Sequence, residues 1–69
     1  MFVVKVTTNY PNGMVGEAYY QGKFMGMYEF SNMENCKHFD SSDGADQIVK
    51  ELEVAIAREN RIIEIVEVS

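Results

Sequence analysis

The stretch ADQIVKELEVAIAREN, residues 45–60, decides the fold, because it is the long segment with helical periodicity. Its apolar side chains form one stripe: Ala45, Ile48, Val49, Leu52, Ala55 and Ile56. Its charged side chains lie away from that stripe: Asp46, Lys50, Glu51, Glu53 and Arg58. We therefore predict an amphipathic helix that Ser42 or Asp43 caps at its start and Asn60 ends.

The remaining chain has the alternation and turn residues of β-strands. Three strands are predicted before the helix and one after it, at residues 2–8, 14–21, 24–30 and 61–68. NYPNG (9–13) and Gly22-Lys23 are the predicted turns, and CKHF (36–39) is a possible short extra strand. The two terminal strands are the most apolar. We expect them to be adjacent, with the last strand flanked on both sides.

This element order predicts a single α+β domain over residues 1–69. It is a two-layer sandwich, in which a mainly antiparallel sheet of four or five strands is covered on one face by a single helix. We assign the helix-covered face these side chains: Met14, Gly16, Ala18, Tyr20, Phe24, Gly26, Tyr28 and Phe30. The small residues Gly16, Ala18 and Gly26 would leave a trough that the helix approaches.

The other face of the sheet is too apolar for an ordinary solvent-facing surface. It would gather Val3, Val15, Tyr19, Met25 and Met27, with Glu17 and Glu29 among them. Tyrosine and methionine are common in protein interfaces because they bury much area and adapt their shape. This face is therefore our first candidate for partner binding or for a homodimer contact.

The net charge of −5 is confined to the second half of the chain. Residues 1–33 are neutral overall, whereas residues 34–69 hold nine acidic and four basic side chains. Such a surface disfavours nucleic acid and anionic lipid, and it attracts a basic surface on another protein. The acidic residues expected to make that contact are Asp46, Glu51, Glu53 and Glu59.

The lone cysteine excludes an intrachain disulfide and favours a cytoplasmic location. The first residues, MFVVKVTT, lack the basic and apolar regions of a signal peptide, and no apolar run approaches the ~20 residues of a membrane span.

A second class of function is metal binding. In an extended segment Cys36, His38 and Asp40 would point the same way, and all three are zinc-ligand types. The alternative is a buried cysteine, a surface histidine and an aspartate near the helix cap. No catalytic residue is predicted, because nothing would orient His38 as a base for Cys36 and no oxyanion-type turn follows.

In size, acidity and layout the chain resembles small phage-encoded inhibitors of host defence, including anti-CRISPR proteins. The resemblance carries no residue assignments. It implies a non-enzymatic protein in the host cytoplasm that blocks a basic surface of a nucleic-acid enzyme, such as a CRISPR effector nuclease. The alternatives are a metal-binding accessory domain and a homodimeric accessory protein without inhibitory activity.

Overall fold

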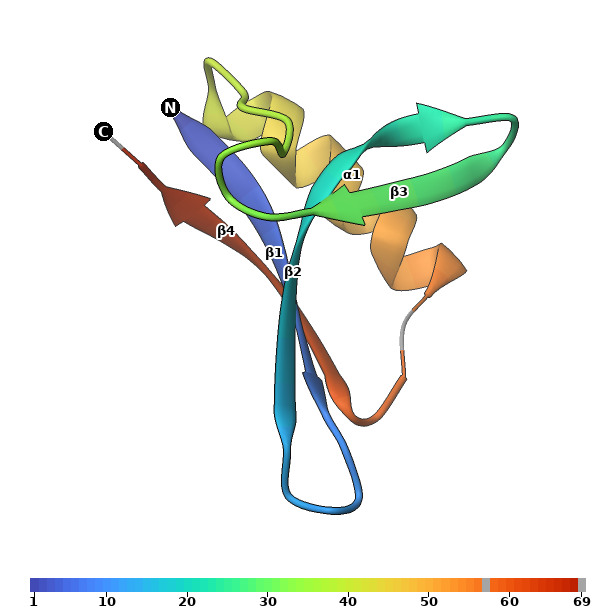
Figure 1. Cartoon of the computed structure of the whole chain (residues 1–69). Helices are drawn as coiled ribbons and strands as arrows, with labels where there is room; N and C mark the ends of the chain where they lie inside the picture. The colour runs from blue at the N-terminus through green and yellow to red at the C-terminus, as the bar shows by residue number, and fades with distance from the viewer. Residues whose placement is uncertain (57, 69) are drawn as a thin grey trace.

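The computed structural model describes residues 1–56 and 58–68. It is a four-stranded antiparallel sheet with one helix packed on one face, which confirms the α+β prediction (Figure 1). The elements are β1 (Phe2–Asn9), β2 (Val15–Phe24), β3 (Met27–Ser31), α1 (Ser42–Ala55) and β4 (Arg61–Glu67). The strand order is β3-β2-β1-β4, so the two terminal strands are adjacent as predicted. No helix in the described part of the chain has the length and hydropathy to cross a membrane.

The turn between β2 and β3 differs from the prediction. It lies at Met25-Gly26 and not at Gly22-Lys23, which are inside β2. Both turn residues have positive φ, 52° at Met25 and 81° at Gly26. Two-residue hairpin turns with two positive φ angles match the twist of the flanking strands, and glycine is favoured there.

A β-bulge explains why the predicted faces of this hairpin were partly wrong. Tyr20 pairs with Phe30 and Gly22 pairs with Glu29, so Gln21 is an extra residue on β2. The insertion shifts the alternation of β2 by one position. Phe24 was predicted in the core, but it pairs with Met27 on the opposite face.

Two further strand predictions were wrong. The segment 36–39 forms no strand, and only a bridge joins Phe39 to Phe2, with N···O distances of 2.9 and 2.8 Å. The Cys36 N–H bonds instead to the Asn32 carbonyl, which holds the chain in a local turn. The last strand, β4, lies at the edge of the sheet, so Ile62 on its outer face is exposed.

The helix is shifted from its predicted bounds at both ends. Ser41 is the N-cap, and its Oγ accepts a hydrogen bond from the Gly44 N–H at 3.5 Å. The helix ends at Ala55, where the Ile56 N–H donates to the Leu52 carbonyl. Asn60, the predicted stop, lies in the turn before β4, and its side-chain amide donates to the Asn9 carbonyl.

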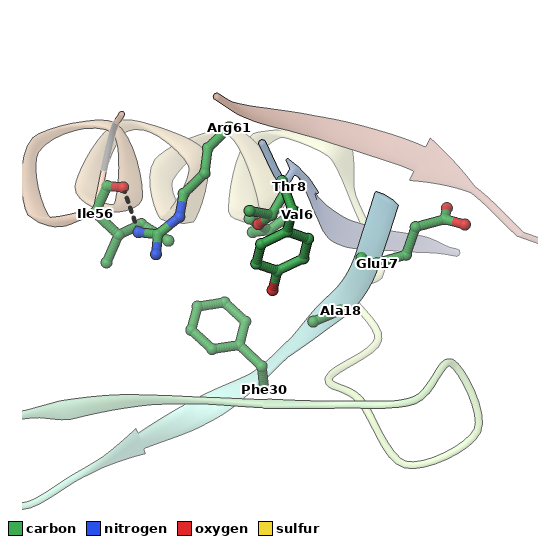
Figure 2. Close-up of a pocket in the computed structure, with 9 residues that line it drawn as sticks. Val6, Thr8, Glu17, Ala18, Phe30, Ile56 and Arg61 are labelled. Atoms are coloured by element: carbon green, nitrogen blue, oxygen red, sulfur yellow. Dashed lines mark hydrogen bonds between the residues drawn. The ribbon is translucent and has the colours of Figure 1, made fainter. Parts of the chain in front are cut away.

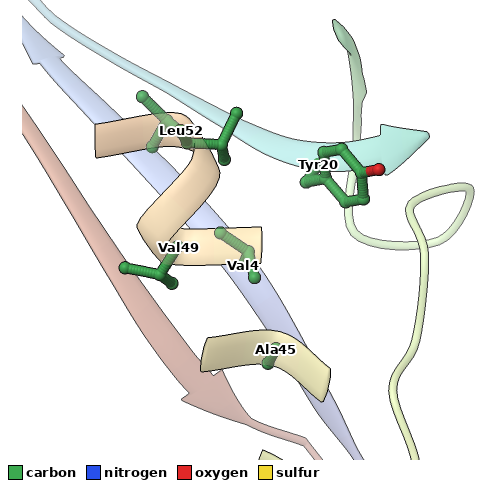
Figure 3. Packing of buried hydrophobic residues seen from close by; sticks show 6 residues of the cluster. Val4, Tyr20, Ala45, Val49 and Leu52 are labelled. Carbon is green, nitrogen blue, oxygen red and sulfur yellow. The ribbon is translucent and has the colours of Figure 1, made fainter. Parts of the chain in front are cut away.

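The core lies between α1 and the central strands. Its buried members are Val4, Val6, Tyr20, Ala45, Val49 and Leu52, most of them labelled in Figure 3. The backbone of α1 lies over β1 and β4, and the helix meets β2 and β3 only through side chains such as Tyr20 and Tyr28. The predicted trough is therefore not filled by the helix: Gly16 and Ala18 line an open hollow, and Gly26 is in the hairpin turn.

Candidate functional site

The face of the sheet opposite α1, the helix-free face, is set by strand alternation and register. It carries Val3, Lys5, Thr7, Val15, Glu17, Tyr19, Phe24, Met27, Glu29, Ile62, Glu64 and Val66. Val15, Tyr19 and Met27 thus lie on the face where the sequence placed them. Val3 does too, but it has no exposed surface, so it cannot contact a partner as predicted.

Three large apolar side chains are exposed together where β2 turns into β3. Phe24 is 64% exposed, Met25 in the turn is 86% exposed, and Met27 is 72% exposed. We call these three residues the hairpin tip. Taking about 200 Å² for a side chain of phenylalanine size, they expose roughly 400 Å², the size at which surface patches mark interaction sites. The sequence identified the two methionines but missed Phe24, because a turn at Gly22-Lys23 would place Phe24 in the third strand, on the same face as Tyr28.

The centre of the helix-free face is charged. The Lys5 ammonium lies 2.7 Å from a Glu17 carboxylate oxygen and 3.8 Å from one of Glu64. The hydrogen bond to Glu17 raises the pKa of Lys5 above its ordinary value, with smaller contributions from nearby charges. These ion pairs separate Val15, which is 59% exposed, from the hairpin tip. The predicted apolar cluster is therefore two patches with charged residues between them.

The acidic residues of α1 lie in the other layer of the sandwich. Asp46 pairs with Lys50 at 3.2 Å, and Glu51 lies 3.9 Å from the Lys23 ammonium and accepts a hydrogen bond from the Tyr28 hydroxyl at 3.3 Å. Glu53 is exposed on the same helix, and Glu59 is exposed in the turn before β4. A flat partner surface that contacts the hairpin tip on the helix-free face does not also contact the exposed side of α1.

The structure does not bring Cys36, His38 and Asp40 together as metal ligands. The Cys36 thiol is buried and donates to the Met33 carbonyl at 3.3 Å, whereas His38 and Asp40 are exposed. The His38 Nδ1 lies 3.1 Å from the Cys36 carbonyl oxygen. Within residues 1–56 and 58–68, no three histidine, cysteine, aspartate or glutamate side chains are grouped to hold a metal ion. The predicted zinc geometry fails because residues 36–40 are not an extended strand.

Burial makes Cys36 a structural thiol with a predictable pH effect. Desolvation raises the pKa of Cys36 and also that of Tyr20, so the folded state keeps both protons to higher pH than the unfolded chain. Folding stability should therefore be constant from neutral pH to about 8.5, the ordinary cysteine pKa, and should fall as the pH rises further. Urea unfolding at a series of pH values measures this. In Cys36→Ala, folding stability should fall less steeply just above about pH 8.5. A wild-type stability that rises above about pH 8.5 would contradict the raised pKa of Cys36.

A hollow of about 220 Å³ opens on the helix-covered side where α1 stops short of β2 and β3. Its lining includes Val6, Gly16, Ala18, Phe30 and Ile56, most of which are labelled in Figure 2. Arg61, at the start of β4, extends beside Ile56 and reaches the hollow. The hollow thus lies next to the C-terminal end of α1, with lining residues from all four strands.

Comparison of the chain with protein-family models, with curated proteins and with solved structures finds no match.

Proposed function

We propose that this protein is a protein-binding module that contacts its partner through the helix-free face, centred on the hairpin tip. The observation that supports this most is the exposure of Phe24, Met25 and Met27 side by side. Their burial against a partner would remove a large apolar area from water, which is the main driving force of association. Flexible methionines beside a rigid aromatic ring suit a surface that must fit another protein.

The backbone of the tip supports the same proposal. Met25 is the one non-glycine residue with positive φ in the described parts of the chain. This conformation is uncommon for a side-chain-bearing residue, and such strain is concentrated at functional sites. Asparagine or glycine would fit the turn with less strain. The strain of a methionine at positive φ is consistent with a side chain that contacts a partner and does not stabilise the fold.

The charges beside the tip indicate the chemistry of the partner. Three carboxylates, those of Glu17, Glu29 and Glu64, share the helix-free face with Lys5, the one cation that the described strands place there. A complementary partner has an apolar recess bordered by lysine or arginine. A nucleic-acid enzyme presents such basic surfaces, so the more specific proposal is inhibition of a CRISPR effector nuclease or a related enzyme by steric block. The acidic side of α1 would contribute long-range attraction and not the contact itself.

The hairpin tip is tested with Phe24→Asp and Met27→Asp. Both side chains are exposed, so the far-ultraviolet circular dichroism spectrum and melting temperature should stay close to those of the wild type. Affinity for the partner should fall by about 30-fold or more, as for a hot-spot residue. Biolayer interferometry against a panel of purified effector nucleases, with cleavage assays in parallel, provides the measurement.

The matched control is Val54→Asp, which introduces the same charge at an apolar residue on α1 that is 90% exposed. It should bind like the wild type. Equal loss in the control, or full binding by both tip variants, would refute the proposed surface. If the tip variants instead convert a dimer to a monomer in sedimentation equilibrium, the surface is a homodimer contact and the inhibitor proposal fails.

A further inference from the structure

Arg61 brings a positive charge into a largely apolar hollow. Its Nη1 donates to the Ile56 carbonyl at 2.8 Å, which anchors the guanidinium at the C-terminal end of α1. Figure 2 shows the side chain running from β4 to this carbonyl, with the guanidinium on the side of the hollow that faces Phe30. An arginine has five N–H donors in a fixed fork, so one hydrogen bond leaves most of its donors available.

No carboxylate in residues 1–56 or 58–68 forms an ion pair with Arg61. Glu17 borders the hollow, but its side chain points away from it, and its carboxylate is bound to Lys5 on the other face of the sheet (Figure 2). The positive charge in the hollow is therefore not neutralised from within the described chain. A half-buried guanidinium without a counterion favours an anion that enters the same space.

Apart from Thr8 and Glu17, the other residues that line the hollow are apolar or aromatic. A Cβ at Gly16 would come within 3.0 Å of the Tyr10 ring, so glycine allows this ring to lie against β2. Ala18 adds a single methyl group to the floor, and the Phe30 ring stands opposite Ile56. An apolar cavity of about 150 Å³ is large enough for benzene. The hollow of about 220 Å³ has room for one ring together with a carboxylate.

We propose that this hollow, the Arg61 pocket, binds a small monocarboxylate with a flat apolar body. The ligand carboxylate accepts hydrogen bonds from the Arg61 N–H groups that do not bond to Ile56. The ligand ring lies over Ala18, between Tyr10 and Phe30. A single arginine in an apolar wall suits a singly charged ligand better than a phosphate, which keeps more of its hydration. The net charge of −5 also disfavours binding of polyanions. The Arg61 guanidinium attracts a small anion that comes within a Debye length of about 8 Å. This site is independent of the helix-free face.

Phenylacetate is the probe for the pocket, and ¹H–¹⁵N correlation spectra provide the readout. Shifts should concentrate at Ala18, Phe30, Ile56 and Arg61, with a dissociation constant of about 1 mM or tighter for a ligand of this size. Arg61→Met should weaken binding about tenfold or more, because it removes a charge-assisted hydrogen bond. Phenylacetamide, which has the same shape without the charge, should bind as weakly to the wild type as phenylacetate binds to Arg61→Met.

Two further variants make the result specific. Lys50→Met, on the outer side of α1, changes the net charge as Arg61→Met does and should leave binding unchanged. Ala18→Ile, which fills the floor, should abolish the shifts while the spectrum of the free protein stays dispersed. Equal affinity for phenylacetamide, equal loss in Lys50→Met, or shifts scattered over the whole surface would overturn the proposal. Phe24→Asp should bind phenylacetate normally, so failure of the hairpin-tip proposal and failure of this one are distinguishable.

Discussion

Replacing Leu52 with alanine is expected to leave much of the protein unfolded at physiological temperature. Leu52 has no exposed surface and packs against β1 with its core neighbours, as Figure 3 shows. Such a truncation costs about 2–5 kcal/mol through lost burial and the cavity left behind. A domain of this length has about 3–10 kcal/mol of total stability, so the substitution removes a large share of it.

Urea denaturation followed by circular dichroism measures the loss. The control is Val54→Ala, which removes an apolar side chain from the same helix at a position that is 90% exposed. Its stability should stay within about 0.5 kcal/mol of the wild type. A Leu52→Ala variant that loses less than about 1 kcal/mol would mean that the site collapses around the cavity, or that α1 is not docked as described.

Replacing Val3 with aspartate should be at least as damaging, although Val3 lies on the helix-free face. It has no exposed surface, and it is paired with Val66 on β4. The bridge between Phe2 and Phe39 brings the chain after β3 alongside this end of β1. An isolated charge placed there costs several kcal/mol. We expect a destabilisation of about 3 kcal/mol or more, or no folded protein at all.

The comparison with Val15→Asp makes this prediction specific. Val15→Asp makes the same substitution on the same face. Because Val15 is 59% exposed, this variant should fold with nearly wild-type stability. Thermal unfolding of the two variants distinguishes a buried end of the face from its exposed remainder. A folded Val3→Asp variant with normal stability would show that this end of the face is open to solvent and available to a partner.

The helix-free face therefore has two different parts. At the end near Val3 it is part of the fold, because Val3 pairs with Val66 and has no exposed surface. At the hairpin tip the apolar side chains are exposed. The hairpin tip is the larger exposed apolar patch of this face, and Val15 is a smaller one. A patch of apolar residues in a strand pattern thus marks a binding surface only where the fold leaves its side chains exposed.

The sequence by itself determined the elements whose signals are local. The apolar stripe of α1, the alternation of β1 and the Asn12-Gly13 turn predicted an α+β domain with one helix on the sheet, and the structure confirms it. The most apolar strands were correctly placed side by side. These features follow from periodicity and from turn chemistry within a few residues.

Only the tertiary structure decided where the exposed and hollow surfaces lie. The bulge at Gln21 turned Phe24 outward, because one unpaired residue reverses every later side chain on its strand. The backbone of α1 lies over β1 and β4, and the Arg61 pocket stays open next to the C-terminal end of the helix. Register and helix position depend on pairing between residues far apart in the chain. Local propensity does not encode them, and both candidate sites depend on them.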